Sequence, residues 1–317
     1  MVKSAKNLFR ALFISAFIIF LLSPELNAQG SGSGRRMITF TQFLLFPRFW
    51  LSVLIGLGGG VLLVTLKIRR TIRAILLSGV FILFGVLPHF HEIEFFAKLA
   101  PHPSPLCSFA KPVMFSLQAK QFVLPPVFAG VLAFIVFLSI VGNKLFCGWV
   151  CPIGALQEVC YLLPIVRQKK RLSYFAVNTI RYGLLVFFVP ALVHFGIYLY
   201  GYFNPFEILH WRVGTEFWIL YTWIVIAITI TVSLFTFRPF CHIVCPIGAL
   251  TWLLEHISVA RIRLLKDRCN QCGLCVKKSP CMAVNAILAG KRVRPDCYAC
   301  GKCIEVCPEN AVAFNIK

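Results

Sequence analysis

Five long apolar stretches between residues 46 and 260 constrain the fold of this chain more than any other feature. Each approaches the ~20 residues that a helix needs to cross the hydrocarbon core of a bilayer. The stretches are Phe49–Leu66, Ala74–Phe90, Phe122–Gly142, Tyr182–Tyr200 and Phe217–Phe237. Only 14% of the residues are charged, whereas soluble domains carry about 25%. We therefore expect an α-helical integral membrane protein with about five transmembrane helices, over residues 46–260.

The basic residues between the stretches predict the orientation of the chain. They gather after the first, third and fifth stretches, as is typical of cytoplasmic segments. These residues are Lys67, Arg69, Arg70, Arg73, Arg167, Lys169, Lys170, Arg171, Arg238, Arg261, Arg263, Lys266 and Arg268. Residues 91–121 and 201–216 hold few basic residues and are expected outside. The pattern predicts a multi-pass protein of the bacterial inner (cytoplasmic) membrane with its C-terminal domain in the cytoplasm.

The N-terminal region predicts secretion rather than a further span. Met1–Arg10 is basic, Ala11–Leu22 is apolar, and Ala28 offers a cleavage point. We interpret residues 1–28 as a signal peptide, with an uncleaved anchor as the alternative. Residues 29–45, with the flexible segment Gly30–Gly34, are expected to form a linker on the outer side. The net charge of +21 needs no nucleic-acid partner, because no basic face with interleaved aromatic residues is visible.

Eight cysteines in the last 49 residues form two staggered runs. Three cysteines at x2 spacing with a remote fourth match the bacterial ferredoxin pattern, in which the fourth cysteine serves the other cluster. The pattern predicts one [4Fe–4S] cluster on Cys269, Cys272, Cys275 and Cys307. It predicts a second cluster on Cys297, Cys300, Cys303 and Cys281. We expect residues 261–317 to form an α+β 2[4Fe–4S] ferredoxin-like domain.

The first run is irregular, since five residues separate Cys275 from Cys281 and Pro280 precedes that cysteine. We interpret this as a loop insertion that keeps the ligand. A zinc ribbon is the first alternative, but it uses two cysteines per knuckle and leaves the third unused. Disulfides are the second, and they require an oxidising compartment.

A repeated C-x3-C-P-I-G-A-L motif follows two of the apolar stretches. The first copy holds Cys147 and Cys151, and the second holds Cys241 and Cys245. Pro and Gly predict a turn after the span, followed by a short interfacial helix on the cytoplasmic side. If the loops meet, the four thiols could form a third metal site for an iron–sulfur cluster, zinc or copper(I). Redox-active or inert thiol pairs that shape a quinone pocket are the alternative.

With both loops and the cysteine runs, residues 45–317 resemble the NapH/NosR/FixG (CcoG) group of membrane polyferredoxins. The resemblance implies electron transfer in a respiratory chain by a quinol dehydrogenase component that serves a periplasmic reductase. Copper-handling members imply an alternative, a copper-reducing or redox-regulatory assembly protein. NosR-like proteins carry an FMN-binding domain where this chain has only the signal peptide and Gly30–Gly34. The chain also ends ten residues after Cys307, which favours a NapH-like interpretation.

A membrane electron carrier implies further partners and sites. We expect quinone, membrane lipid, and a periplasmic or membrane redox protein with haem, flavin or copper that docks on residues 91–121 and 201–216. Intramembrane ionisable residues are pointers to a quinone site, here His194, Arg181 and Glu158. Their alternatives are a snorkelling Arg181 and a solvated Glu158.

Three other residues have simpler interpretations. Cys107 lies in a proline-rich segment near His89, His91 and His102, and an ordered surface loop is favoured there over a metal or docking site. Cys160 is expected to be a packing residue. His242, between the second pair of loop cysteines, is expected to be hydrogen-bonded rather than a ligand.

Overall fold

A computed structural model places most of the chain after residue 43. It describes residues 44–65, 68–90, 92–101, 103–166, 168–195, 199–202, 204–206, 209, 216–291 and 296–316. The predicted signal peptide, most of the linker, His91, His102 and much of the segment 201–216 lie outside the described residues.

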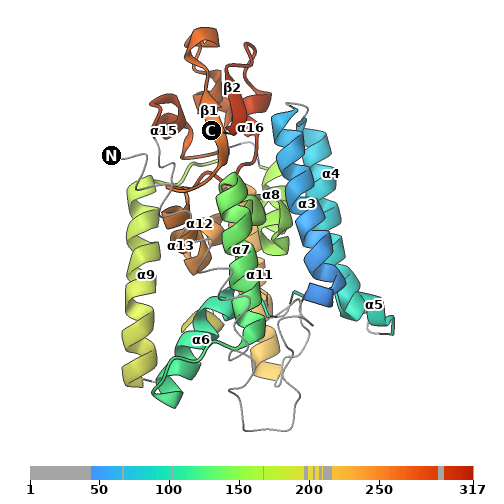
Figure 1. The fold of residues 1–317 in the computed structure, drawn as a ribbon. Coiled ribbons are helices and arrows are strands. Elements are labelled where there is room, and N and C mark those ends of the chain that lie inside the picture. Colours follow the sequence, from blue (N-terminus) through green and yellow to red (C-terminus); the bar gives the residue numbers. More distant parts are fainter. Residues whose placement is uncertain are drawn as a thin grey trace.

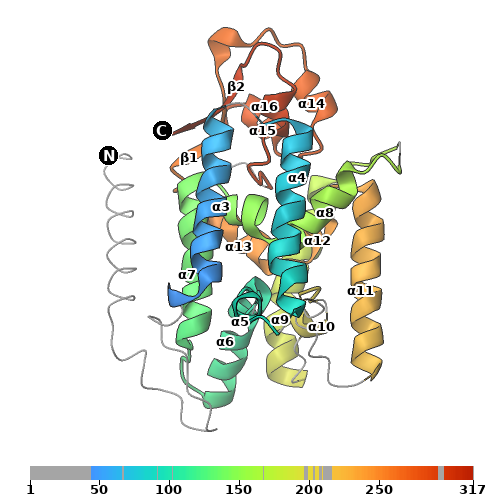
Figure 2. The ribbon, with the colours of Figure 1, turned by 90° about the vertical axis from the view of Figure 1, so that its right-hand side faces the viewer.

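The apolar stretches form an upright helical bundle (Figures 1 and 2). Three helical segments are long and apolar enough to cross a membrane: α3 (Pro47–Val64), α4 with η2 and η3 (Arg70–His89), and α9 (Tyr174–Phe195). Two further apolar helices, α7 (Pro126–Gly142) and α11 (Glu216–Phe235), complete the bundle. Within the second segment, α4 covers Arg70–Phe81, the π-helix η2 covers Ile82–Val86 and the 3₁₀ turn η3 covers Leu87–His89.

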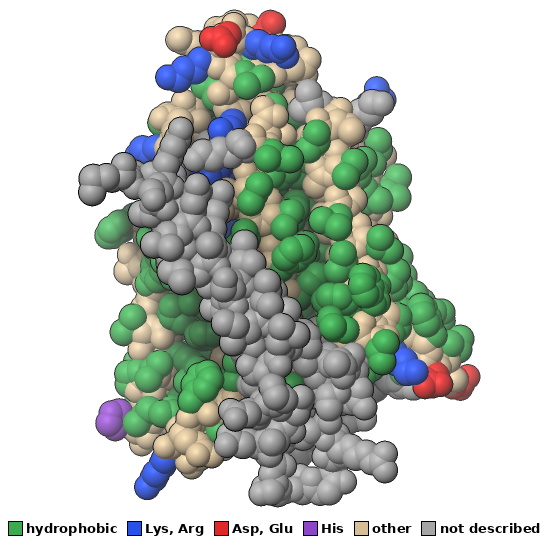
Figure 3. Space-filling model, viewed as in Figure 1, with side chains coloured by type: hydrophobic (Ala, Val, Ile, Leu, Met, Phe, Trp, Pro, Cys, Tyr) green, Lys and Arg blue, Asp and Glu red, His purple; other side chains and the backbone are tan. Residues whose placement is uncertain are grey.

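The outer surface of the bundle is apolar. Large exposed side chains include Leu54 and Val61 on α3, and Val186 and Phe187 on α9. Figure 3 shows hydrophobic side chains covering the helices, with Lys, Arg, Asp and Glu gathered at the two ends. Such a belt is costly in water and favourable in lipid. The chain is a membrane protein.

The C-x3-C-P motifs form the predicted turns and short helices, and most of their side chains are buried among the other helices. The first copy forms η4 (Phe146–Val150) and α8 (Pro152–Leu162). The second forms α12 (Pro239–Ile243) and α13 (Pro246–Leu254). α8 packs against α4 and α11, and α13 packs against α6, α7 and α9.

The segment predicted as an outer surface loop contains the 15-residue helix α6 (Pro105–Ala119), after the short α5 (Glu94–Ala97). Pro105 begins α6, and the hydroxyl of Ser104 accepts a hydrogen bond of 3.2 Å from the backbone N–H of Cys107. α6 packs against α7, α13 and the short α10 (Leu199–Tyr202). The surface-loop interpretation was therefore wrong at Cys107, which is buried inside the bundle.

The C-terminal part caps one end of the bundle (Figures 1 and 2). Its strands β1 (Ala260–Leu264) and β2 (Val312–Ile316) pair antiparallel, with Ala260 opposite Ile316. Between them lie η6 (Lys266–Arg268), α14 (Leu274–Lys278), α15 (Val284–Leu288) and α16 (Lys302–Glu305). The backbone N–H of Val259 donates to the carbonyl of Ile140 at 2.7 Å, so β1 begins against the end of α7.

Candidate functional site

The outermost group of cysteines surrounds a cavity of about 390 Å³ in the C-terminal part. We call this group the distal set; it consists of Cys269, Cys272, Cys275 and Cys307. The four thiols come from the first run and the end of the second, as the ferredoxin spacing predicts. Their cavity provides room for a group larger than a single ion.

The second group, the central set, is formed by Cys281, Cys297, Cys300 and Cys303, and all four are buried. Burial, and then the neighbouring thiols of the other three cysteines, raise the pKa of Cys281 well above its usual value. Cys281 thus lies with its predicted partners despite the irregular spacing before it. Thiolates crowded in this way are stabilised by a bound positive centre, which is how cluster ligands behave. Cys303 also interacts electrostatically with Cys275 of the distal set, so the two sets adjoin.

The two cysteine loops repeat the same backbone conformation. Gln271 and Gly273 have φ angles of 58° and 69°, and Ala299 and Gly301 have φ angles of 47° and 74°. In each loop these positions flank the second cysteine of the run. Positive φ is uncommon for residues other than glycine and concentrates at functional sites. The repetition shows that the two cysteine runs share the same pattern of positive φ angles.

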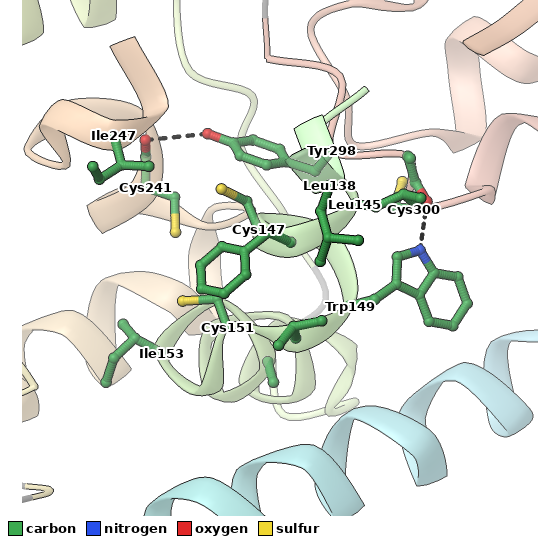
Figure 4. Close-up of a cluster of buried hydrophobic side chains, with 14 of the residues drawn as sticks. Leu138, Leu145, Cys147, Trp149, Cys151, Ile153, Cys241, Ile247, Tyr298 and Cys300 are labelled. Carbon is green, nitrogen blue, oxygen red and sulfur yellow. Dashed lines mark hydrogen bonds between the residues drawn. The ribbon is translucent and has the colours of Figure 1, made fainter. Parts of the chain in front are cut away.

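The four loop cysteines, which we call the membrane set, meet inside the bundle. Cys147, Cys151, Cys241 and Cys245 interact electrostatically with one another. Figure 4 shows the sulfur atoms of Cys147, Cys151 and Cys241 facing a common space. Cys147, Cys151 and Cys241 are at most 9% exposed. The two motif copies therefore build one thiol site.

The motif residues explain how the loops reach this arrangement. Cys151 and Cys245 each precede the proline that begins a helix, with nearly identical φ and ψ of −67° and 118°, and −66° and 116°. A Cβ on Gly154 would lie 2.9 Å from the carbonyl oxygen of Cys147, and one on Gly248 would lie 2.7 Å from that of Cys241. Glycine is needed at both positions because the first cysteine's backbone packs against it.

The thiols of the described residues are not arranged around a single metal ion. Among the described residues, no group of three or more His, Cys, Asp and Glu side chains is placed to hold one metal ion. This holds for the membrane set as for the ferredoxin-type sets. Thiolate donors suit iron–sulfur clusters, zinc and copper(I), and the ferredoxin spacing is what favours clusters on the distal and central sets.

Direct hydrogen bonds connect the central and membrane sets. Asn143 Nδ2 donates to the carbonyl of Cys297 at 3.2 Å, and Trp149 Nε1 donates to the carbonyl of Ala299 at 3.1 Å. Tyr298 Oη donates to the carbonyl of Cys241 at 3.1 Å; Figure 4 draws this bond and the one from Trp149. The loop that carries the central set is thus bonded to both C-x3-C-P segments.

A buried ion cluster lies beside these loops, centred on Glu158. Its carboxylate accepts from Arg73, at 3.0 Å for Nη2, and from Arg238, at 2.9 Å for Nε. Arg238 also donates to the carbonyl of Gly148 at 3.0 Å. Glu158 is therefore not on a solvated face. Arg73, Arg238 and Arg261 were assigned to cytoplasmic segments, but they are 5%, 0% and 5% exposed.

A second buried cluster centres on Asp296, next to Cys297. Arg181 Nη1 donates to Asp296 Oδ1 at 2.7 Å, and Lys144 lies 3.8 Å from the same atom. Lys144 also pairs with Glu255 at 3.3 Å. Burial alone would raise the pKa of Asp296, but Lys144 and the other nearby cations hold it below its usual value. Arg181 does not snorkel at the interface; it fixes the C-terminal domain to α9.

The remaining candidates fall outside the thiol sites. His194 is exposed on α9. Cys107 lies 3.6 Å from Asn204 Nδ2, and Cys160 is buried in α8. His242 is buried, and its Nδ1 lies 2.8 Å from the carbonyl oxygen of Arg238, as expected for a hydrogen-bonded residue. Sequence reasoning missed Lys144 and Asp296; the charged Lys144 directly after an apolar span was the available signal.

A family model described as a 4Fe-4S binding domain matches residues 123–173 and 218–264. Each matched segment contains one C-x3-C-P loop. The ferredoxin-type protein NapH of Haemophilus influenzae is 28% identical over 202 residues, covering 59% of this chain and 68% of that protein. The putative electron transport protein YccM of Escherichia coli is 30% identical over 202 residues, covering 58% and 54%. These matches support a NapH/NosR-like membrane polyferredoxin.

The match to NosR covers a smaller share of both chains than the match to NapH. The regulatory protein NosR of Pseudomonas aeruginosa is 29% identical over 174 residues, covering 51% of this chain but 23% of that protein. No solved structure matches the chain. The likeness supports an iron–sulfur electron-transfer protein, and the structure has helices able to span a membrane.

Proposed function

We propose that the chain carries electrons between a quinone pool and a redox partner through [4Fe–4S] clusters on its three cysteine sets. The distal set would hold one cluster and the central set a second, as the ferredoxin pattern predicts. The membrane set would hold a third. When bound, such clusters supply one-electron oxidation and reduction.

The observation that carries the proposal is the unbroken order of the three sets. Cys275 of the distal set adjoins Cys303 of the central set. Tyr298, between two central-set cysteines, bonds to Cys241 of the membrane set. The three sets therefore form one route for electrons between the inside of the bundle and the C-terminal domain. Because a quinol gives up two electrons and each cluster accepts one, adjoining clusters suit a quinol donor.

The quinone site is better sought in an apolar cleft than at the predicted charged residues. Glu158 and Arg181 are held in ion pairs, and His194 lies on the outer surface. A cleft beside the first C-x3-C-P loop is lined by Phe49, Phe134, Phe146 and Pro152, with Arg48 and Ser52 as polar groups. Quinone sites are expected to have this composition, and this cleft of about 70 Å³ would have to widen to admit a quinone ring. Pro152 directly follows Cys151 of the membrane set.

We also propose that the chain has five membrane spans, with its C-terminal domain in the cytoplasm of a bacterial inner membrane. A haem, flavin or copper protein would be its partner on the outer side. We also propose the domain limits, namely a signal peptide over 1–28, a linker over 29–45, a transmembrane domain over 46–260 and a ferredoxin domain over 261–317. A copper-reducing or assembly role is the alternative, because the soft thiolates of the membrane set also suit copper(I). Copper(I) titration of the purified chain would test that role separately.

Anaerobic quinol addition to the purified, iron-loaded protein tests the proposal. We expect a menaquinol or ubiquinol analogue to reduce the clusters. Absorbance and electron paramagnetic resonance would measure this reduction. A variant with Cys147→Ser and Cys241→Ser should keep the distal and central clusters and their reduction by dithionite, but lose reduction by quinol. Absence of reduction by either quinol in the unmodified protein would contradict the proposal.

A further inference from the structure

A cationic pocket lies where the membrane bundle meets the C-terminal domain, beside Cys300 of the central set. Its volume is about 200 Å³. Five cations line it, namely Arg70, Arg73, Lys169, Lys278 and Lys302. Two carboxylates, Glu158 and Glu305, line it as well. Counted without the Cys300 thiolate, which also lines the pocket, five positive and two negative charges leave a formal surplus of three positive charges in this space.

Both carboxylates of the pocket are already paired. Glu158 is held by Arg73 and Arg238, and Glu305 accepts from Lys302 at 2.7 Å.

Among the described residues, the side chains of the other three cations form no ion pair, although the backbone N–H of Arg70 donates to Glu305 at 2.9 Å. In the described part of the chain neither Lys169 nor Lys278 forms an ion pair, and the guanidinium of Arg70 donates to the carbonyl of Leu162. Burial, and then the charge of Arg70, lower the pKa of Lys169. The pocket therefore presents crowded cations without enough anions of its own.

The pocket lies at the edge of the apolar belt. Its remaining wall includes Ile68, Leu162 and Phe237. Exposed hydrophobic side chains begin within about two helical turns of it, at Ile72 on α4 and Phe235 on α11. A ligand bound here would have an anionic group in the pocket and apolar chains along these two helices.

We propose that this pocket binds the phosphate group of an anionic phospholipid. Basic pockets between helices at the membrane interface bind such headgroups. Arg70 and Lys169 belong to the bundle, whereas Lys278 and Lys302 belong to the C-terminal domain. One phosphate would therefore contact both parts and hold the domain against the membrane next to the central set. The inference rests on the proposed membrane insertion and is independent of the electron route.

Native mass spectrometry of the full, iron-loaded protein tests this site with three probes: phosphatidylglycerol, phosphatidylcholine and inorganic phosphate. We expect retention of one phosphatidylglycerol per chain, weakened by raising the salt from about 0.05 to 0.5 M. Replacing Lys169→Gln and Lys278→Gln together should weaken its binding about thirty-fold. The matched control, Lys98→Gln with Lys120→Gln, removes the same charge at the opposite end and should bind like the unmodified protein.

Several outcomes would overturn the assignment. Equal retention of phosphatidylcholine would contradict recognition of an anionic lipid. Equal loss in both double variants, or salt-independent retention in the unmodified protein, would contradict this site. Retention of inorganic phosphate without phosphatidylglycerol would assign the pocket to a soluble phosphate instead. Flotation of the unmodified protein with lipid vesicles tests membrane insertion separately.

Discussion

The hydroxyl of Tyr298 donates a hydrogen bond of 3.1 Å to the carbonyl oxygen of Cys241. Tyr298 lies between Cys297 and Cys300, and it is 1% exposed. Its ring also packs edge-on against His242, with centroids 5.1 Å apart. The C-terminal domain is therefore bonded directly to the membrane set rather than tethered by a flexible connection. A fixed separation between the sets is what electron transfer between them requires.

Replacing Tyr298→Phe should keep the ring contacts but leave the buried carbonyl of Cys241 without this partner. Leaving a buried acceptor unsatisfied costs about 1–3 kcal/mol. We expect a lower midpoint for thermal loss of the cluster absorbance. Tyr174→Phe, at a residue 46% exposed, is the control and should change stability by less than about 0.5 kcal/mol. Equal midpoints for the two variants would show that the Tyr298 bond contributes nothing.

The two equivalent loop glycines should respond differently to alanine. Both have positive φ, which costs an alanine about 1–2 kcal/mol. A Cβ on Gly301 would also lie 2.9 Å from Leu63 on α3, whereas one on Gly273 would meet nothing within 4 Å. Gly301→Ala should therefore raise hydrogen exchange in the C-terminal domain more than Gly273→Ala. The reverse order would contradict the docking of the central loop on α3.

Replacing Glu158→Gln should destabilise the protein strongly, because two buried arginines lose their carboxylate. Breaking a buried ion pair costs about 3–5 kcal/mol. The exposed pair of Glu94 and Lys98 provides a control, since Glu94→Gln should leave the stability nearly unchanged. Thermal unfolding of both variants measures the difference. A Glu158→Gln protein with unchanged stability but lost quinol oxidation would instead support a direct role at the quinone.

Cys281 is the ligand with irregular spacing, and its replacement tests the central set. Cys281→Ser should lower the iron content by up to about four atoms per chain. Cys160→Ser changes a buried cysteine outside the three sets and should leave the iron content unchanged. Iron and acid-labile sulfide assays provide the measurement. Full iron content in the Cys281→Ser protein would remove this residue from the central set.

The lengths of the apolar stretches and the spacing of the cysteines predicted most of the helices and the grouping of the cysteine sets. Each apolar stretch contains most of a helix, although α9 begins at Tyr174, eight residues before Tyr182. The apolar pattern did not indicate this start, because the polar residues Asn178 and Arg181 interrupt it. Arg181 is buried through its ion pair with Asp296 rather than through apolar packing. The turn and helix of each C-x3-C-P motif followed from Pro and Gly.

The buried charges could not be predicted, because their partners are distant in sequence. Arg73 and Glu158 are 85 residues apart, and Arg181 and Asp296 are 115 apart. The sequence pattern assigned Arg73 to a cytoplasmic loop and Arg181 to the fourth span, and it indicated the carboxylate partner of neither. The helix α6 was missed because prolines surround Cys107, although Ser104 followed by Pro105 is a helix-start signal.

Iron and sulfide per chain test the three-cluster proposal most directly. We expect about twelve iron and twelve sulfide atoms in the anaerobically purified protein, four of each per cysteine set. The variant with Cys147→Ser and Cys241→Ser should hold about eight of each and keep the resonance signals of the other two clusters. Eight irons in the unmodified protein, unchanged in this variant, would contradict a cluster on the membrane set.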